Sequence, residues 1–249
     1  VTIIVPFLDA YDVNWATGET TLLYRIDMGI NIRSGAHYTQ FQVWDYDGDG
    51  KAEIAVKTAP GTTVLRPTDG TANTLAEAEY IDVPSSSLPT EKISEKNDYR
   101  NASGYVLDGP EYFTMFNGEN GSILDTTDFV PARGNVGAEI LISATDKDGN
   151  TLTKGVYLSW RSFEADFDND NNLKTTFTVY RDGVTIAENV SVTNMVDEGG
   201  TSASTYKVVG SNDSAIGVKA VDTKCWEHQY LELNLYAPAD ETMPEYNGE

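Results

Sequence analysis

The sequence is poor in cysteine and in positive charge. Its single cysteine, Cys225, excludes a disulfide within the chain. Its 17 lysines and arginines face 39 aspartates and glutamates, and the formal charge of −22 argues against binding to nucleic acid or to an anionic membrane surface. No apolar run approaches transmembrane length. With 249 residues, the chain can form one large or two modest domains. We therefore expect a secreted or cell-surface protein, stabilised by its core and by bound metal.

The stretch from Gln40 to Thr58 gathers acidic residues on one short loop between two apolar runs. Its oxygen ligands predict a site for a hard cation, and calcium is the natural occupant. The predicted ligands are Asp45, Asp47, Asp49 and Glu53 through their side chains and Lys51 through its backbone carbonyl. An EF-hand is excluded, because loop position twelve is Val56 and helices are not expected on either side. The alternative is a solvated acidic turn without metal.

Short runs of apolar and β-branched residues predict β-strands through the first half of the chain. These runs are 2–13, 20–28, 40–44, 52–58, 111–116 and 122–129. Two of the predicted hairpins have similar Gly-rich turns, and paired hairpins form the four-stranded blades of a β-propeller. Between them, residues 59–108 read as a long polar loop with a surface excursion at 83–90. We predict a partial β-propeller over residues 1–137.

The second half predicts seven short strands at the spacing of an immunoglobulin-like or fibronectin type III sandwich. They are 139–145, 156–162, 175–181, 184–190, 205–209, 215–221 and 230–236. Trp160 is expected in the core, and the missing disulfide favours a fibronectin type III-like domain over residues 138–249. Asp166, Asp168 and Asp170 are read as an acidic loop in preference to a second ion site. The tail from Ala237 is expected to be a linker or a frayed end.

Several segments carry a resemblance to a known family. They are Arg25–Phe41 (RIDMGINIRSGAHYTQF), the acidic loop, Lys57–Thr62, Tyr99–Tyr105, Gly109–Tyr112 and Val130–Gly134, followed by Gly155–Arg161, Val179–Gly183, Ser204–Val208 and Gln229–Leu231. Together they resemble the rhamnogalacturonan lyases of polysaccharide lyase family eleven. The chain departs from that family in two ways: its fibronectin-like part follows the propeller part, and most of the family's propeller blades have no counterpart in it.

The resemblance implies a calcium-dependent β-elimination on the rhamnogalacturonan I backbone of pectin, in which a base removes the proton at C5 of a galacturonate. Lys57 and His37 are the candidate bases, and we expect Arg33, Tyr38 and Arg100 to bind substrate. Lys57 could instead be a solvated strand-end lysine, His37 could order a turn, and the two arginines could form surface ion pairs. We expect His228 to be structural and the protein to be a monomer.

Two other classes of function stay open at this point. A non-catalytic carbohydrate-binding module would show the same aromatic and acidic surface, and an adhesion or scaffold protein could use calcium-stiffened β-units. The segments around Gly35–Tyr38 and Gly109–Tyr112 favour the lyase, because a generic calcium-binding blade needs neither. In each reading the ion in the loop is expected to stiffen the hairpin and not to take part in catalysis.

Overall fold

The computed structural model describes residues 5–35, 38–69, 74–81, 85–88, 97–141, 144–145, 147–152 and 154–227. Within these residues the regular structure consists of β-strands, apart from the 3-10 helix η2 (Glu164–Asp166) and the one-turn helix α1 (Asp213–Ile216). The prediction of an all-β fold is therefore confirmed. Neither helix has the length or the apolar character that crossing a membrane requires.

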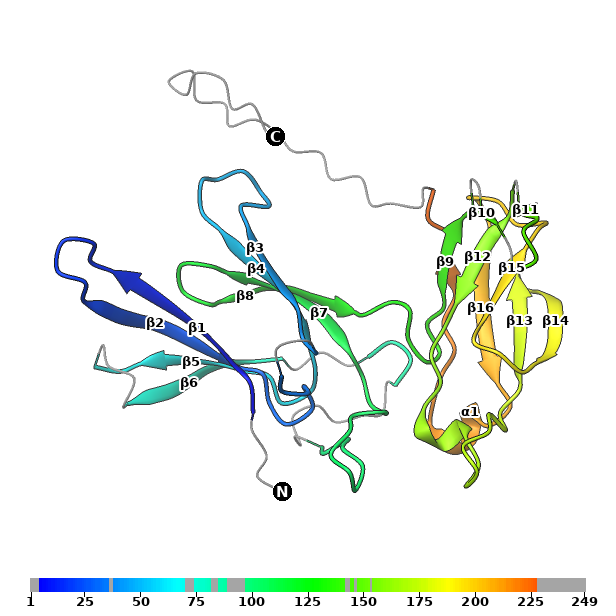
Figure 1. Cartoon of the computed structure of the whole chain (residues 1–249), viewed down its shortest axis with the longest axis horizontal. Coiled ribbons are helices and arrows are strands. Elements are labelled where there is room, and N and C mark those ends of the chain that lie inside the picture. Colours follow the sequence, from blue (N-terminus) through cyan, green and yellow to red (C-terminus); the bar gives the residue numbers. More distant parts are fainter. Residues whose placement is uncertain are drawn as a thin grey trace, which may run out of the picture. The chain divides into compact units, whose positions relative to one another are not determined.

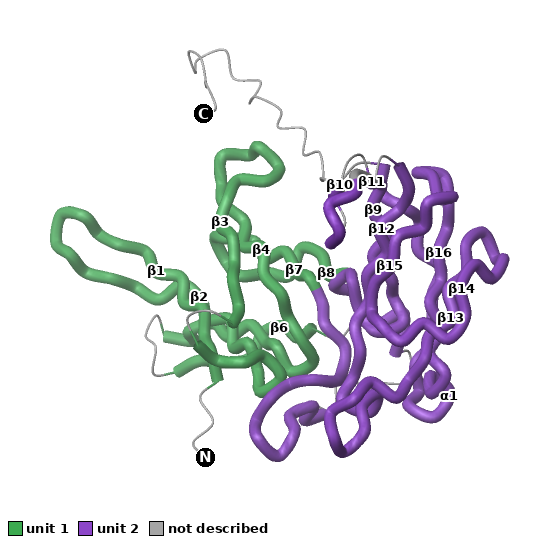
Figure 2. Tube along the Cα trace, turned by 45° about the vertical axis from the view of Figure 1, so that its right-hand side comes forward, with its two compact units in different colours: residues 1–82, 113–127, 232–249 green, residues 83–112, 128–231 purple. Residues whose placement is uncertain are grey.

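The chain falls into two compact units, shown in green and purple in Figure 2. Of the described residues, unit 1 takes those up to 81 together with 113–127, and unit 2 takes 85–112 and 128–227. The chain thus enters unit 2, returns to unit 1 for one hairpin, and then completes unit 2. The division into domains at residues 137 and 138 stays a prediction.

Unit 1 contains two four-stranded sheets (Figure 1). The first has the order β1-β2-β5-β6, with β1 (Phe7–Val13), β2 (Thr20–Asp27), β5 (Thr63–Pro67) and β6 (Leu75–Tyr80). The second has the order β3-β4-β7-β8, with β3 (Phe41–Trp44), β4 (Glu53–Thr58), β7 (Tyr112–Asn117) and β8 (Ile123–Asp128). The strands predicted in this half end within a few residues of the observed ones, because alternating polarity and Gly-rich turns specify hairpins locally.

The turn between β7 and β8 connects the two sheets of unit 1. Tyr24 on β2 donates its hydroxyl hydrogen to the carbonyl of Gly118 (2.9 Å), and Nε of Arg66 on β5 donates to the carbonyl of Asn120 (2.8 Å). Gly121 has φ +73°, and a Cβ there would lie 2.6 Å from the ring of Tyr24. The turn is thus held by specific contacts that require glycine.

The prediction of one long polar loop over residues 59–108 is wrong. β5 and β6 form an antiparallel hairpin in this stretch and complete the first sheet. Val64 and Ile81 are buried, which supplies the apolar contact that a loop would lack. The excursion predicted at 83–90 is also not wholly on the surface, since Ser85, Ser87 and Leu88 are buried.

Unit 2 contains a three-stranded sheet and a four-stranded sheet that share one core, as in a sandwich. The first, ordered β15-β12-β9, has β9 (Gly137–Ile140), β12 (Val156–Ser159) and β15 (Asn194–Asp197). The second, ordered β14-β13-β16-β17, has β13 (Phe177–Arg181), β14 (Val184–Val190), β16 (Thr205–Gly210) and β17 (Thr223–Lys224). A two-stranded sheet pairs β10 (Ala144–Thr145) with β11 (Thr151–Leu152).

The core of unit 2 confirms the predicted place of Trp160, which is 4% exposed and packs edge-on against Phe177 with ring centroids 5.5 Å apart. Two strand predictions fail here. β15 was not anticipated, and residues 215–221 are not a strand, because α1 occupies their start and Gly217 ends it at φ +74°. The strand predicted at 230–236, the tail from Ala237 and His228 lie outside the described residues.

A buried charge cluster holds the irregular segments of unit 2. The guanidinium of Arg133, 1% exposed, pairs through Nε with Asp166 (3.1 Å) and through Nη2 with Asp213 (2.5 Å). Burial by itself would raise the pKa of Asp166, but the backbone N–H of Phe163 and the charge of Arg133 outweigh burial and lower it. The carboxylate of Asp166 is therefore paired with Arg133 and is not a ligand of a second ion site together with Asp168 and Asp170.

We predict that Arg133→Met destabilises unit 2 by about 3–5 kcal/mol, because it leaves Asp166 buried without a counter-charge. Urea unfolding followed by the fluorescence of Trp160 measures the loss. Arg161→Met is the matched control, since Arg161 pairs with Glu111 at a partly exposed position, and it should cost at most about 1 kcal/mol. Equal losses for the two variants would contradict the assignment.

Candidate functional site in the β3–β4 hairpin

The β3–β4 hairpin positions most of the predicted site residues. Its strands pair antiparallel, with Trp44 opposite Glu53 and Phe41 opposite Val56. The acidic loop therefore joins the hairpin at the Trp44 end. The residues before Phe41 reach the other end, where Lys57 lies on β4. The predicted ligands and the predicted base thus occupy opposite ends of one hairpin.

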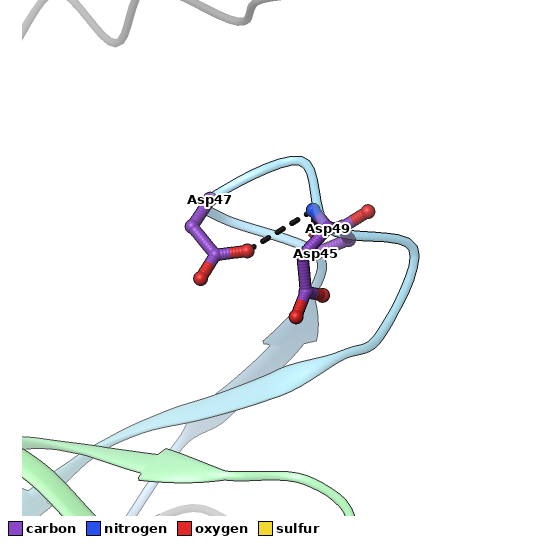
Figure 3. A group of neighbouring side chains, drawn as sticks. All are labelled: Asp45, Asp47 and Asp49. Carbon is purple, nitrogen blue, oxygen red and sulfur yellow. Dashed lines mark hydrogen bonds between the residues drawn. The ribbon is translucent and has the colours of Figure 1, made fainter. Parts of the chain in front are cut away.

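The acidic loop brings three carboxylates together, as Figure 3 shows. One side-chain oxygen from each of Asp45, Asp47 and Asp49 lies within 4.8 Å of the other two. Backbone N–H groups set this arrangement. Asp45 accepts from Gly48 (2.8 Å) and Gly50 (2.9 Å), and Asp47 accepts from Asp49 (3.1 Å). The two glycines, at φ +78° and +86°, allow the chain to fold back over Asp45.

These three aspartates fit a calcium ion. Calcium–oxygen distances of about 2.3–2.6 Å allow two ligand atoms to lie as much as about 5 Å apart, so a mutual spacing within 4.8 Å is compatible with one shared ion. Calcium prefers oxygen ligands, and this set is entirely oxygen. In the described part of the chain this is the one cluster of three such side chains. A bound calcium ion would receive three of its six to eight oxygens from these side chains.

The other two predicted ligands have different surroundings. Glu53 is 4% exposed, and its Oε2 accepts from the backbone N–H of Tyr46 (2.8 Å), outside the three-carboxylate cluster. The ammonium of Lys51 pairs with Glu119 on the β7–β8 turn (2.7 Å). Glu119, through this hydrogen bond, and Asp49, through its charge, both raise the pKa of Lys51. The carbonyl of Lys51 stays a predicted ligand.

The end of the hairpin that carries Lys57 is packed against the segment after β2. The hydroxyl of Thr62 donates to the carbonyl of Met28 (3.0 Å), and the buried amide of Asn31 donates to the carbonyl of Pro60 (2.9 Å). A Cβ on Gly29 would lie 2.7 Å from the carbonyl oxygen of Gly61, so the two segments approach too closely for any side chain there. Two of the segments that carry the family resemblance are thereby held side by side.

Arg33 and Tyr38 lie in this same region of unit 1. The guanidinium carbon of Arg33 stands 3.7 Å from the centre of the Tyr38 ring, a cation–π geometry, and Tyr38 is 51% exposed. Arg33 also lines a mainly apolar pocket of about 420 Å³ with Phe7 and Met28. His37 lies outside the described residues, so its role stays a prediction.

Arg100, the remaining predicted site residue, belongs to unit 2. Its guanidinium holds Asp98 through two hydrogen bonds, from Nε (2.7 Å) and from Nη2 (2.5 Å). This contact has the geometry of the surface ion pair considered as the alternative for Arg100. A substrate carboxylate would have to replace Asp98 on the same guanidinium.

The sequence did not single out a second group of polar residues in unit 2. Asp108, Glu111, Asp128 and Arg161 line one pocket there. The segment Gly109–Tyr112 was part of the family resemblance, but no role was assigned to it. The residues that line the pocket with this segment come from distant parts of the chain, so their spacing along the sequence does not predict that they lie together.

Comparison with known proteins shows that the chain is similar to parts of rhamnogalacturonan lyases. Residues 4–154 match the model described as "Rhamnogalacturonan lyase family 11, C-terminal domain", and residues 149–226 match "Rhamnogalacturonan I lyases beta-sheet domain". The rhamnogalacturonan endolyase YesW of Bacillus subtilis (strain 168) is 47% identical over 129 residues, which are 52% of this chain and 16% of that protein. The rhamnogalacturonan exolyase YesX of the same organism is 45% identical over 127 residues, or 51% of this chain and 16% of that protein.

Among solved structures, the crystal structure of the exotype lyase YesX aligns with a TM-score of 0.36 at 32% identity and covers 73% of this chain and 26% of that one. The chain spans 16% of the length of the curated relatives it matches. Because the family model covers more than half of its residues, the chain belongs to rhamnogalacturonan lyase family 11.

Proposed function

We propose that this chain contributes to a rhamnogalacturonan lyase that cleaves the rhamnogalacturonan I backbone of pectin by β-elimination. The observation that carries the proposal is the match of residues 4–154 to the family model. Matched relatives bear the names of an endolyase and an exolyase, so the mode of attack is left open.

In the proposed reaction a base takes the proton from C5 of a galacturonate. The electron pair of that C–H bond forms the C4–C5 double bond, the C4–O bond breaks, and the leaving oxygen is protonated. The neutral form of Lys57 or of His37 is the base. Arg33 and Arg100 bind uronate carboxylates, and the exposed ring of Tyr38 provides a stacking surface.

We assign calcium to Asp45, Asp47 and Asp49, with Glu53 and the carbonyl of Lys51 as further predicted ligands. Calcium bound near a uronate neutralises the carboxylate beside C5 and makes that proton more acidic. The loop does not suit this task, because Glu53 at its edge and Lys57 are four residues apart on β4, or about 13 Å at 3.3 Å per residue. The proposed role of the loop is therefore to stiffen the hairpin that carries Lys57.

We further propose that the two sheets of unit 1 are propeller blades and that residues 138–249 form a fibronectin type III-like domain. The support is the pair of four-stranded sheets and the two-sheet core around Trp160. The acidic composition and the polymeric substrate suit a secreted or cell-surface protein. The proposed partner is the pectic polysaccharide, and neither nucleic acid nor membrane is part of the proposal.

Calcium should raise the melting temperature, and a chelator should lower it. An ion that binds only the folded chain adds about 2.7 kcal/mol at a hundredfold excess over its Kd. Asp47→Asn and Asp49→Asn should reduce the calcium response, whereas Asp12→Asn, an exposed position on β1, should leave it unchanged. Scanning calorimetry with calcium and with chelator measures each case. An identical melting temperature in both buffers would favour the metal-free acidic turn.

The complete protein should release products with a new conjugated double bond, detected by ultraviolet absorbance during digestion of rhamnogalacturonan I. Lys57→Ala or His37→Ala should lower kcat by at least about 10²-fold if the residue transfers the proton. Lys207→Ala is the control, because its ammonium pairs with Asp222 in unit 2. Products without the double bond would overturn the lyase proposal, and an unchanged kcat would remove that residue from proton transfer.

Asp98 should titrate with a pKa of about 2, because hydrogen bonds from Arg100 stabilise its charged form. Arg100→Gln should return the pKa towards 3.8, whereas Arg161→Gln should not. NMR titration of the carboxyl carbon measures both. The stability gained from this pair is present above pH 3.8 and is lost as pH falls through about 2. It should not exceed about 1 kcal/mol, since Asp98 is 47% exposed. A normal pKa would mean that Arg100 is available to substrate.

A further inference from the structure

Unit 2 contains a pocket of about 170 Å³ that the proposed reaction does not use. Three segments wall it, residues 85–88, 106–111 and 161–163, together with Asp128 and Arg133. It is smaller than the roughly 300–1,000 Å³ of pockets that hold drug-sized ligands. The pocket has room for one small molecule and not for an oligosaccharide.

Hydrogen bonds between the segments give the pocket a defined shape. Arg161 pairs with Glu111 (2.8 Å), and Asp108 accepts from the backbone N–H of Glu164 (2.9 Å). Asp128 accepts from both the backbone N–H and the hydroxyl of Ser86. Each wall segment is therefore tied to another part of unit 2, which is what a preformed binding site requires.

Arg133 borders the pocket, but its side chain has no exposed surface and does not reach a ligand there. Its Nε and Nη2 hold carboxylates, but its buried Nη1 has no hydrogen-bond partner among the described residues. The pocket also contains the buried hydroxyls of Ser85 and Ser87.

The charges around the pocket disfavour an acidic ligand. Arg161 is paired with Glu111, and Arg133 is paired with Asp166 and Asp213. The remaining charged side chains of the lining, Asp108 and Asp128, are both acidic. A ligand carboxylate would be repelled by them, whereas an uncharged hydroxyl can donate a hydrogen bond to a carboxylate.

Apolar side chains also contribute to the lining. They include Val106, Leu107, Pro110 and Phe163, and Leu107 is 48% exposed. Apolar and aromatic surface suits the C–H face of a sugar ring, and the polar groups suit its hydroxyls. A ligand that is neutral, rich in hydroxyls and the size of one ring satisfies every part of this lining.

We propose that this pocket binds a single neutral sugar unit, with Asp108 and Asp128 accepting hydrogen bonds from its hydroxyls. The site goes beyond the lyase proposal, since it requires neither Lys57 nor the acidic loop.

The test is an NMR titration of the ¹⁵N-labelled chain with galactose and with galacturonate, which differ in the carboxylate at C6. Galactose should cause saturable shifts in the amide signals of residues 85–88 and 106–109, with galacturonate binding at least tenfold more weakly. Asp108→Asn should weaken galactose binding about tenfold by removing a charged acceptor. It retains an oxygen for the N–H of Glu164 and should fold normally.

Asp170→Asn, on an exposed loop of the same unit, is the matched control and should bind galactose like the parent chain. Absence of saturable shifts at the pocket would overturn the proposal. Equal or tighter binding of galacturonate, or an unchanged affinity in Asp108→Asn, would overturn it as well. These measurements involve no bond cleavage, so their outcome is separate from that of the lyase assay.

Discussion

Unit 2 depends on one buried guanidinium. Arg133 follows β8 and precedes β9, and it joins η2 to α1 through Asp166 and Asp213. These segments lie outside the strands of the two sheets, so the charge cluster supplies the connection that a ladder of backbone hydrogen bonds would otherwise provide. A buried ion pair adds little net stability compared with apolar residues of similar volume. Removing one partner is strongly destabilising, because the other charge stays buried without a counter-charge. The Nη1 of the same residue is buried and has no hydrogen-bond partner among the described residues.

In unit 1 the register of the β3–β4 hairpin places the proposed metal-binding loop and the proposed base, Lys57, at opposite ends. Pairing Trp44 with Glu53 keeps the acidic loop at one end of the hairpin, and pairing Phe41 with Val56 brings the start of β3 to the end that carries Lys57. A shift of register by one residue would reverse the faces of β3 and disturb both ends together. The register of the hairpin therefore fixes the distance between the acidic loop and Lys57, the proposed base.

Features that are local in sequence were predictable, and features assembled from distant segments were not. The acidic loop was found because Asp45, Asp47 and Asp49 alternate with Tyr and Gly over five positions. The β5–β6 hairpin was missed because the strand 75–80 alternates alanine and glutamate and offers little apolar signal. The partners of Arg133 lie in later, separate segments, and no spacing rule connects them. The walls of the pocket in unit 2 come together only in the folded chain.

The conformation of the acidic loop also depends on its contacts with the turn between β7 and β8. A Cβ on Gly118 would lie 1.9 Å from the carbonyl oxygen of Ala52, so the end of the loop rests directly on the backbone of the β7–β8 turn. Glycine is required at this position for space, whereas at Gly121 the backbone conformation requires it as well. Lys51 and Glu119 add a second contact between loop and turn. Loop and turn therefore form one structural unit, and transferring the loop to another sheet would require its matching turn.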